Sequence, residues 1–196
     1  MSTSLVDIIA KSLVQTGGFL LWPEKTDEGV LQPYVLDLTT ILSNPRVFER
    51  VAREMVDVVK KEVGVKKFNA VLGIPLAGIP YASYISVKTD KPMLLLKEEK
   101  GRALEGIFKM GDKILIVDDF ILTGRQILKA FDKVVSEGGL VEDAVVIVCQ
   151  SGKAAEKLKK RGVELHFLFD FKKLVESLRR IDALTEEEYE ALLSKI

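Results

Sequence analysis

Two neighbouring carboxylates and a hydroxyl–glycine pair lie close together in the middle of this 196-residue chain. Asp118 and Asp119 follow the apolar run "ILIV", and Thr123 and Gly124 come shortly afterwards. The apolar run predicts a buried strand, and the pattern that starts at Gly124 predicts a helix, with a turn between them. This strand–loop–helix order places the polar residues where a ligand could meet the end of a sheet.

The start of a helix favours a phosphate, because its first amide groups lack partners and its dipole is positive at that end. Thr123 adds a hydroxyl donor, and Gly124 permits close approach of the ligand. Asp118 and Asp119 would repel a phosphate that touched them, so they suit sugar hydroxyls or a divalent cation farther along the same ligand. The stretch therefore predicts a sugar-phosphate site. The alternative is that the two acids only begin a loop and cap a helix.

The composition narrows the class of protein. Its 29 basic and 29 acidic residues cancel, which argues against a nucleic-acid partner. The apolar runs are far shorter than the roughly 20 residues that a membrane span needs, and the N-terminus does not resemble a signal peptide. A single cysteine, Cys149, permits no disulfide within the chain, so we expect a cytoplasmic protein. The abundance of Lys and Glu and the scarcity of Asn and Gln are typical of thermophile proteins.

The single histidine, His166, argues against a Cys/His metal site or a Ser-His-Asp triad. We expect His166 to pack in or beside a strand, and Cys149 to be inert in another.

Apolar strands alternate with helical patterns for most of the length, which predicts an α/β fold with a mainly parallel sheet flanked by helices. We expect a single domain over 1–196, with a small N-terminal cap over about 1–40 and the α/β core over about 41–196. Strands are expected at 18–22, 34–38, 69–74, 92–97, 113–119, 141–150 and 163–169. Helices are expected at 5–15, 44–64, 79–89, 124–139, 152–162, 170–180 and 185–196. Ligands of such sheets bind beyond the carboxyl ends of the strands.

The stretch "ILIVDDFILTG" resembles the motif that binds phosphoribosyl pyrophosphate (PRPP) in type I phosphoribosyltransferases. Two other strand ends extend the likeness to the orotate branch of that family. "GIPLAGIPYAS" resembles its pyrophosphate loop, and "LKEEKGRALEG" resembles its catalytic loop. "YVLDLTTILSNP" and the stretch 146–178 resemble further segments, so the likeness covers about residues 17 to 180.

The resemblance implies an enzyme that transfers the ribose 5-phosphate of PRPP to a nucleobase, with orotate the leading prediction. It implies Mg²⁺ held mainly through PRPP with no direct protein ligand, and a homodimer. It places the ribose on Asp118 and Asp119. The 5-phosphate loop would be Leu122, Thr123, Gly124, Arg125 and Gln126, and the pyrophosphate loop Leu76, Ala77 and Gly78. The catalytic cations would be Lys97, Lys100 and Arg102, and the base pocket Trp22, Tyr34, Leu122 and Gln150.

The departures from the family lie where the base binds. Trp22 replaces a usual lysine, Leu122 a usual hydroxyl residue and Gln150 a usual arginine. The catalytic loop is also shorter, with Leu96 where an arginine is common. Orotate is an anion, and these changes remove charge-assisted bonds to it. Three readings stay open: an orotate enzyme that compensates elsewhere, a transferase for a less charged base, and a binding or regulatory protein without catalysis.

Overall fold

The structure is a computed structural model, and it describes residues 4–26, 29–97 and 103–194. The chain divides into two compact units. The first joins Met1–Val51 to Phe169–Ile196, and the second is Ala52–Leu168. The expectation of a single domain with a cap over about 1–40 stays a prediction. The structure groups the N-terminal segment with the last helices of the chain.

The second unit is built on a sheet whose strand order is β11-β10-β8-β5-β6-β7, with β9 paired to β10. Strands β5, β6, β8, β9 and β10 pair in parallel, and β7 is antiparallel to β6 at the edge. This confirms the predicted mainly parallel sheet. The strands are β5 (Ala70–Gly73), β6 (Met93–Leu96), β7 (Leu104–Glu105), β8 (Ile114–Val117), β9 (Phe120–Ile121), β10 (Asp143–Cys149) and β11 (Glu164–Asp170).

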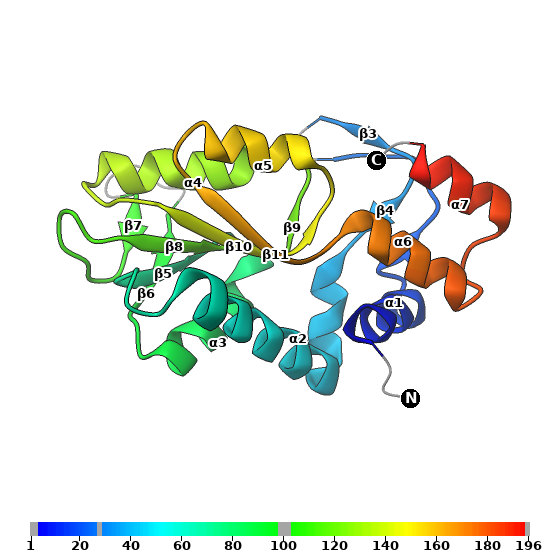
Figure 1. Ribbon diagram of the computed structural model, residues 1–196, viewed down its shortest axis with the longest axis horizontal. Helices are drawn as coiled ribbons and strands as arrows, with labels where there is room; N and C mark the ends of the chain where they lie inside the picture. Colours follow the sequence, from blue (N-terminus) through cyan, green and yellow to red (C-terminus); the bar gives the residue numbers. More distant parts are fainter. Residues whose placement is uncertain (1–3, 27–28, 98–102, 195–196) are drawn as a thin grey trace. The chain divides into compact units, whose positions relative to one another are not determined.

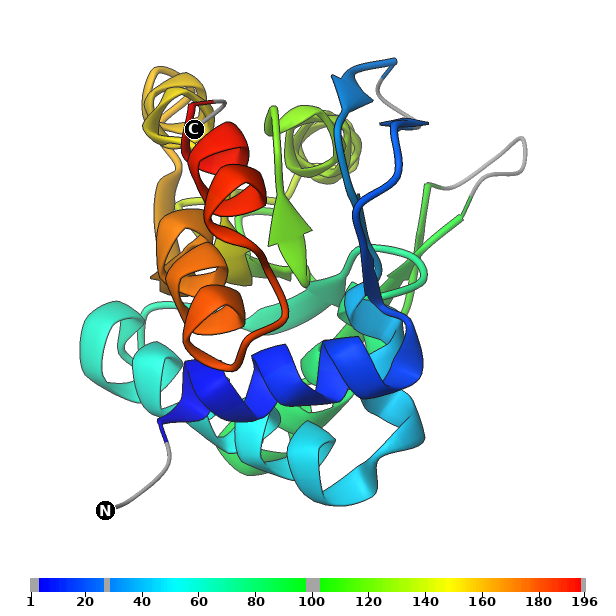
Figure 2. The same ribbon diagram turned by 90° about the vertical axis from the view of Figure 1, so that its right-hand side faces the viewer.

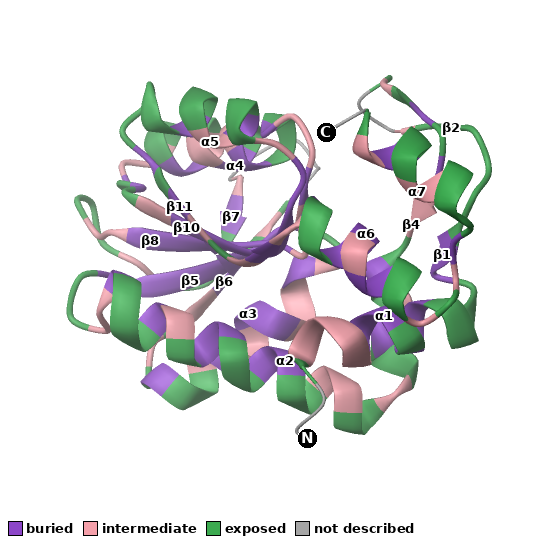
Figure 3. Ribbon diagram, turned by 45° about the vertical axis from the view of Figure 1, so that its right-hand side comes forward, coloured by how far each residue is buried: buried purple, intermediate pink, exposed green. Residues whose placement is uncertain are grey.

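The strands are apolar because helices cover both faces of this sheet. Helices α4 (Arg125–Ser136) and α5 (Gly152–Lys159) lie over one face. Helix α3 (Gly78–Thr89) and the later part of α2 (Pro45–Val58) lie over the other (Figure 1). Every residue of β5 and β8 is buried, whereas the helices expose one side (Figure 3). A π-helical turn, Val59–Val63, extends α2 to Gly64.

The first unit packs helix α1 (Leu5–Thr16) against α6 (Phe171–Arg180), and α6 against α7 (Glu186–Leu193) (Figure 2). The Asp7 carboxylate accepts hydrogen bonds from Ser177 Oγ at 2.6 Å and from Arg180 Nε at 3.1 Å. These bonds hold the pKa of Asp7 well below its ordinary value. The unit also contains two short antiparallel strand pairs and a 3-10 helix: β1 (Phe19–Leu20) with β4 (Val35–Leu36), β2 (Glu24–Lys25) with β3 (Leu31–Gln32), and Leu38–Ser43.

Five short elements were not predicted. The expected turn after Asp119 begins with the two-residue strand β9, which pairs with β10 because the Asp119 carbonyl accepts the N–H groups of Ile147 and Val148. The others are β2, β3, β7 and the 3-10 helix. Two-residue strands carry no measurable period, so only tertiary pairing reveals them. Within the described ranges, no helix is both long and apolar enough to cross a membrane.

Candidate active site

Asp118 and Asp119 stand at the carboxyl end of β8, as the sequence predicted. Asp118 is only 7% exposed, and its Oδ1 accepts the Asp119 N–H at 3.0 Å. Asp118 N–H in turn donates to the carbonyl of Val145 on β10 at 3.1 Å. The backbone of the two acids is therefore held by the neighbouring strand, which gives their carboxylates a defined place at the end of the sheet.

The predicted 5-phosphate loop leads from β9 into the start of α4. Gly124 has a φ of 82°, a left-handed conformation that glycine adopts with little strain. Thr123 Oγ1 accepts the Arg125 N–H at 3.3 Å, and Lys157 Nζ on α5 donates to the Thr123 carbonyl at 3.4 Å. The first amides of α4 can bind an anion, and Lys157 adds a cation that the sequence did not single out.

The predicted pyrophosphate loop lies directly against the acidic strand end. A Cβ at Gly78 would come within 2.3 Å of the Val117 carbonyl oxygen and 3.1 Å of Asp118 Cα. Ile74 N–H also donates to the Val117 carbonyl, at 2.9 Å. Leu76 and Ala77 lie between these contacts, and the Pro75–Leu76 peptide is cis. The fold thus joins two segments that the sequence proposed separately.

Lys97 follows β6 at the base of the β6–β7 hairpin. Its Nζ forms an ion pair with Glu105 on β7, and the two side chains are 45% and 53% exposed. Its N–H donates to the Ala103 carbonyl at 2.9 Å. The carboxylate partner of this predicted catalytic cation was not anticipated. Lys100 and Arg102, the other two predicted cations, lie outside the described residues.

A cavity of about 340 Å³ is bordered by all three predicted segments. The pyrophosphate loop contributes Pro75, the 5-phosphate loop Gln126 and the hairpin Leu96. Two lysines of α4 also line it. The complete lining is Ile74, Pro75, Leu96, Gln126, Lys129, Ala130, Asp132 and Lys133. Lys129 and Lys133 bring positive charge to its wall, which Asp132 partly offsets, so the cavity can hold a polar ligand.

No family model matches the sequence. The orotate phosphoribosyltransferase of Sulfolobus acidocaldarius is 35% identical over 185 residues, covering 92% of this chain and 89% of that protein. This chain belongs to the orotate phosphoribosyltransferase family. It is accordingly a transferase of the phosphoribosyltransferase type. The orotate phosphoribosyltransferase of Pyrobaculum aerophilum is 31% identical and covers 93% of this chain and 95% of that protein.

The solved structures agree with this membership. Leishmania donovani UMP synthase matches with a TM-score of 0.86 and 28% identity, over 97% of this chain and 42% of that one. This chain therefore spans less than half of that protein. An orotate phosphoribosyltransferase from Aeropyrum pernix matches with a TM-score of 0.75 and 25% identity, over 87% of this chain and 98% of that one.

Tyr81 lies near the predicted ribose acids and was not singled out from the sequence. It lies one turn into α3 from Gly78 and is 1% exposed. Burial raises the pKa of its hydroxyl, and the nearby Asp119 carboxylate raises it further. Tyr81 therefore stays neutral beside the acid pair. Its only signal in the sequence was a polar-tipped side chain in an apolar helix.

The predicted base pocket of this family member draws on both units. Gln150 is 6% exposed, and its N–H donates to the Ile121 carbonyl at 2.9 Å, which places Gln150 near Leu122 in the second unit. Trp22, 69% exposed, and Tyr34, 3% exposed, belong to the first unit. The assignment of all four residues to one base pocket stays a prediction.

Tyr34 is packed between aromatic rings in the first unit. Its ring centroid lies 4.7 Å from that of Phe171 and 6.1 Å from that of Phe19. Its hydroxyl is buried, has no hydrogen-bond partner among the described residues, and has a pKa raised by burial. An orphaned hydroxyl of this kind is a candidate donor to a ligand.

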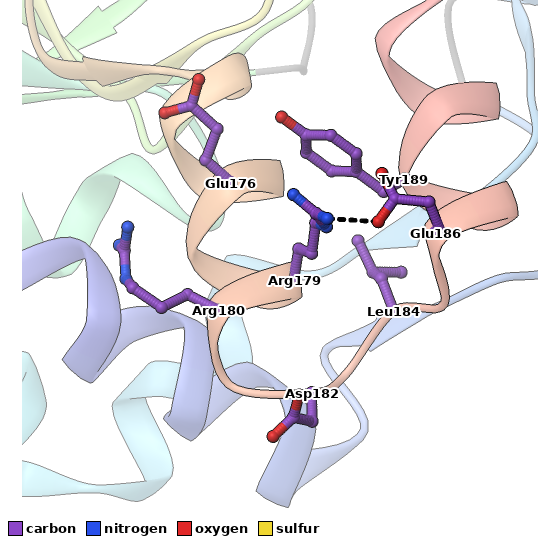
Figure 4. Close-up of a pocket in the computed structure, with 7 residues that line it drawn as sticks. All are labelled: Glu176, Arg179, Arg180, Asp182, Leu184, Glu186 and Tyr189. Atoms are coloured by element: carbon purple, nitrogen blue, oxygen red, sulfur yellow. Dashed lines mark hydrogen bonds and ion pairs between the residues drawn. The ribbon is translucent and has the colours of Figure 1, made fainter.

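A larger cavity, of about 610 Å³, lies in the first unit between α6 and α7 (Figure 4). Its cations already have carboxylate partners. Arg179 pairs with Glu186 and stacks on the Tyr189 ring at 4.8 Å, while Arg180 binds Asp7. The cavity holds none of the residues that the sequence assigned to PRPP, and its paired charges indicate a role in packing.

His166 and Cys149 lie in strands, as the sequence predicted. His166 Nε2 lies 2.8 Å from Asp143 Oδ1, and its Nδ1 lies 3.2 Å from Glu62 Oε2. The bond to Asp143 raises the pKa of His166 despite its partial burial. Cys149 is 4% exposed, and its Sγ donates to the Ser151 carbonyl at 3.4 Å. The histidine therefore serves a structural cluster on β10, β11 and the end of α2.

Proposed function

We propose that this chain transfers the ribose 5-phosphate group of PRPP to orotate, giving orotidine 5′-phosphate and pyrophosphate for pyrimidine nucleotide synthesis. Family membership supports the reaction class. The observation that carries the assignment to this site is the contact between Gly78 and the Val117 carbonyl. It joins the pyrophosphate loop to the acids at adjacent strand ends, so one PRPP molecule can use both.

Each part of PRPP has a matching segment in this proposal. Asp118 and Asp119 accept hydrogen bonds from the ribose hydroxyls. The first turn of α4, with Thr123 and Gly124, binds the 5-phosphate. The loop from Leu76 to Gly78 binds the pyrophosphate through its backbone amides.

The chemistry requires charge stabilisation at the leaving group. A nitrogen of the base forms a bond to the anomeric carbon, and the bond from that carbon to the pyrophosphate oxygen breaks with its electron pair. Cations near the pyrophosphate stabilise this developing charge. Lys97 takes this role, with Lys100 and Arg102 as further candidates. Because Lys97 is paired with Glu105, it must exchange that carboxylate for pyrophosphate when PRPP binds.

Mg²⁺ is the proposed cofactor, and it would be held mainly through PRPP, because this ion often takes its ligands from substrate phosphates and water. Asp118 and Asp119 would place negative charge near the ion while they accept hydrogen bonds from the ribose hydroxyls. Among the described residues, no group of three or more His, Cys, Asp or Glu side chains gathers to hold a metal. When bound, the ion neutralises negative charge on the pyrophosphate.

A second candidate is transfer to a less charged base. It is favoured by Leu122 and Gln150, which place an apolar side chain and a neutral amide where the family usually has a hydroxyl and an arginine. We also propose a homodimer that works in the cytoplasm of a thermophile, from the family likeness and the composition.

The deciding experiment is a turnover screen. Calorimetry with PRPP and Mg²⁺ tests binding, and pyrophosphate release is then measured with orotate, uracil and purine bases in separate reactions. We expect binding of PRPP and release with orotate. Pyrophosphate release with uracil alone would favour the second candidate, transfer to a less charged base. PRPP binding without pyrophosphate release for any base would indicate a regulatory protein and not an enzyme.

A further inference from the structure

Two charged side chains, one in α4 and one at its C-cap, bind the two ends of the segment that follows β6. Lys133 Nζ donates to the Lys97 carbonyl at 2.9 Å. Glu137 Oε1, at the end of α4, accepts the Ala103 N–H at 2.6 Å. Lys133 and Glu137 are four residues apart and share one face of the helix. Lys97 N–H closes the base of the hairpin by donating to the Ala103 carbonyl at 2.9 Å.

The hairpin has little support of its own at this point. It pairs β6 with the two-residue β7 at the edge of the sheet, through Leu95–Glu105 and Leu96–Leu104. A pairing this short is marginal without outside contacts. The bonds from Lys133 and Glu137 are charge-assisted, and such bonds are stronger than those between neutral groups. They therefore contribute to fixing the backbone of Lys97.

Helix α4 is also the helix whose first turn forms the 5-phosphate site. Gln126 at its start and Lys133 two turns later line the same cavity as Leu96 of the hairpin. The helix is a continuous hydrogen-bonded element from Arg125 to Ser136, so its two ends keep a fixed separation. The bond from Lys133 to the Lys97 carbonyl thus holds the backbone of Lys97 at a fixed place relative to the start of α4, where the 5-phosphate would bind.

We propose that Lys133 and Glu137 are positioning residues for phosphoribosyl transfer. They hold the backbone on both sides of the catalytic segment, at Lys97 and at Ala103, against the helix that binds the 5-phosphate. Their effect on the reaction passes through Lys97. The expected effect on the reaction rests on the proposed function. The hydrogen bonds that join α4 to the hairpin are a property of the fold and do not depend on it.

The test uses Glu137→Ala and Lys133→Met, with Glu137→Gln as the conservative variant because its amide oxygen can still accept the Ala103 N–H. Glu156→Ala and Lys160→Met are matched controls, since both residues are exposed on or just after α5. Calorimetry measures binding of pyrophosphate with Mg²⁺ and, separately, of ribose 5-phosphate. We expect Glu137→Ala and Lys133→Met to weaken pyrophosphate binding about tenfold, as for loss of one charge-assisted bond. Ribose 5-phosphate binding should be unchanged, and Glu137→Gln should recover most of the loss.

A double-mutant cycle decides whether the effect passes through Lys97. Combined with Lys97→Ala, Glu137→Ala should add less than about twofold to the loss of pyrophosphate affinity. The proposal would be overturned if the losses of pyrophosphate affinity from the two substitutions simply multiplied in the double variant. It would also be overturned if ribose 5-phosphate binding fell equally, because that would indicate general damage to the fold.

Hydrogen exchange at the Ala103 amide tests the tie without any reliance on activity. Exchange should be faster in Glu137→Ala than in wild type and the Glu156→Ala control. Unchanged exchange would overturn the proposal even in an active enzyme. The protein could show faster exchange and the expected double-mutant cycle and still not turn over orotate. That outcome would support the contact between α4 and the hairpin and refute the proposed reaction.

Discussion

Gly78 lies so close to Val117 that a Cβ at Gly78 would come within 2.3 Å of the Val117 carbonyl oxygen. Real Cβ atoms do not approach backbone oxygen this closely, so a side chain would have to push the two segments apart. The contact joins the N-terminal end of α3 to the carboxyl end of β8. It therefore sets the spacing between the pyrophosphate loop and Asp118.

Gly78→Ala is expected to weaken PRPP binding and lower the free energy of unfolding by about 1–3 kcal/mol, the usual cost of an overpacked site. Calorimetry and urea denaturation measure the two effects. Gly152→Ala is the control, because nothing lies within 4 Å of its Cβ position at the start of α5. Equal behaviour of the two alanine variants would show that the close contact does not matter for binding.

The double variant Asp118→Asn/Asp119→Asn is expected to lose PRPP affinity by about a hundredfold or more, since it removes two charge-assisted acceptors. The amide at position 118 can still accept the Asp119 backbone N–H, so the circular dichroism spectrum should not change. Asp90→Asn is a control at an exposed left-handed position that Asn also tolerates. If the double variant bound PRPP with wild-type affinity, the alternative would hold, in which the two acids only begin a loop and cap a helix.

Leu122→Thr is expected to raise kcat/KM for orotate about fivefold, because it supplies one hydroxyl where the family usually has one. Steady-state assays with orotate and uracil measure the change, with Leu140→Thr as a control at a leucine that is 45% exposed. A gain for uracil and not for orotate would favour the less charged base.

Stability should fall as the pH rises through the raised pKa of His166. Bonds to Asp143 and Glu62 favour the protonated imidazole in the folded state, so its folded pKa lies above the ordinary value of 6.5. The stabilisation is fully present below pH 6.5 and is lost above the folded pKa. We expect a loss of about 1 kcal/mol over this range in urea denaturation. His166→Gln should lack this dependence, and identical pH profiles for the two proteins would contradict the assignment.

Much of the architecture was predictable because it depends on neighbouring residues. The apolar run before Asp118 predicts a buried strand wherever it lies in the fold, and Gly124 marks the start of α4. The capping box of Thr185 and Glu188 also depends on neighbours along the chain, and both of its reciprocal bonds are present. The likeness to the PRPP motif is equally local, so the sequence could propose residues for the acid and phosphate loops, and these roles stay predictions.

The short elements and the partners of the site residues were not predictable. The strands β7 and β9 have two residues each, too few to show a period. Glu105 as the partner of Lys97, and Tyr81 beside Asp119, depend on how β6, β7, α3 and β8 approach one another. Neither pairing has a signal at any fixed spacing in the sequence.

By itself, the sequence determined the order of the longer strands and helices, the acids at the end of β8 and the family. The tertiary structure alone decided that Gly78 meets Val117 and that Glu137 reaches Ala103, 34 residues away. The physical reason is that helix periods, caps and turn residues act over a few neighbouring residues. Contacts between loops depend on the paths of whole strands and helices, which are set only when the sheet assembles.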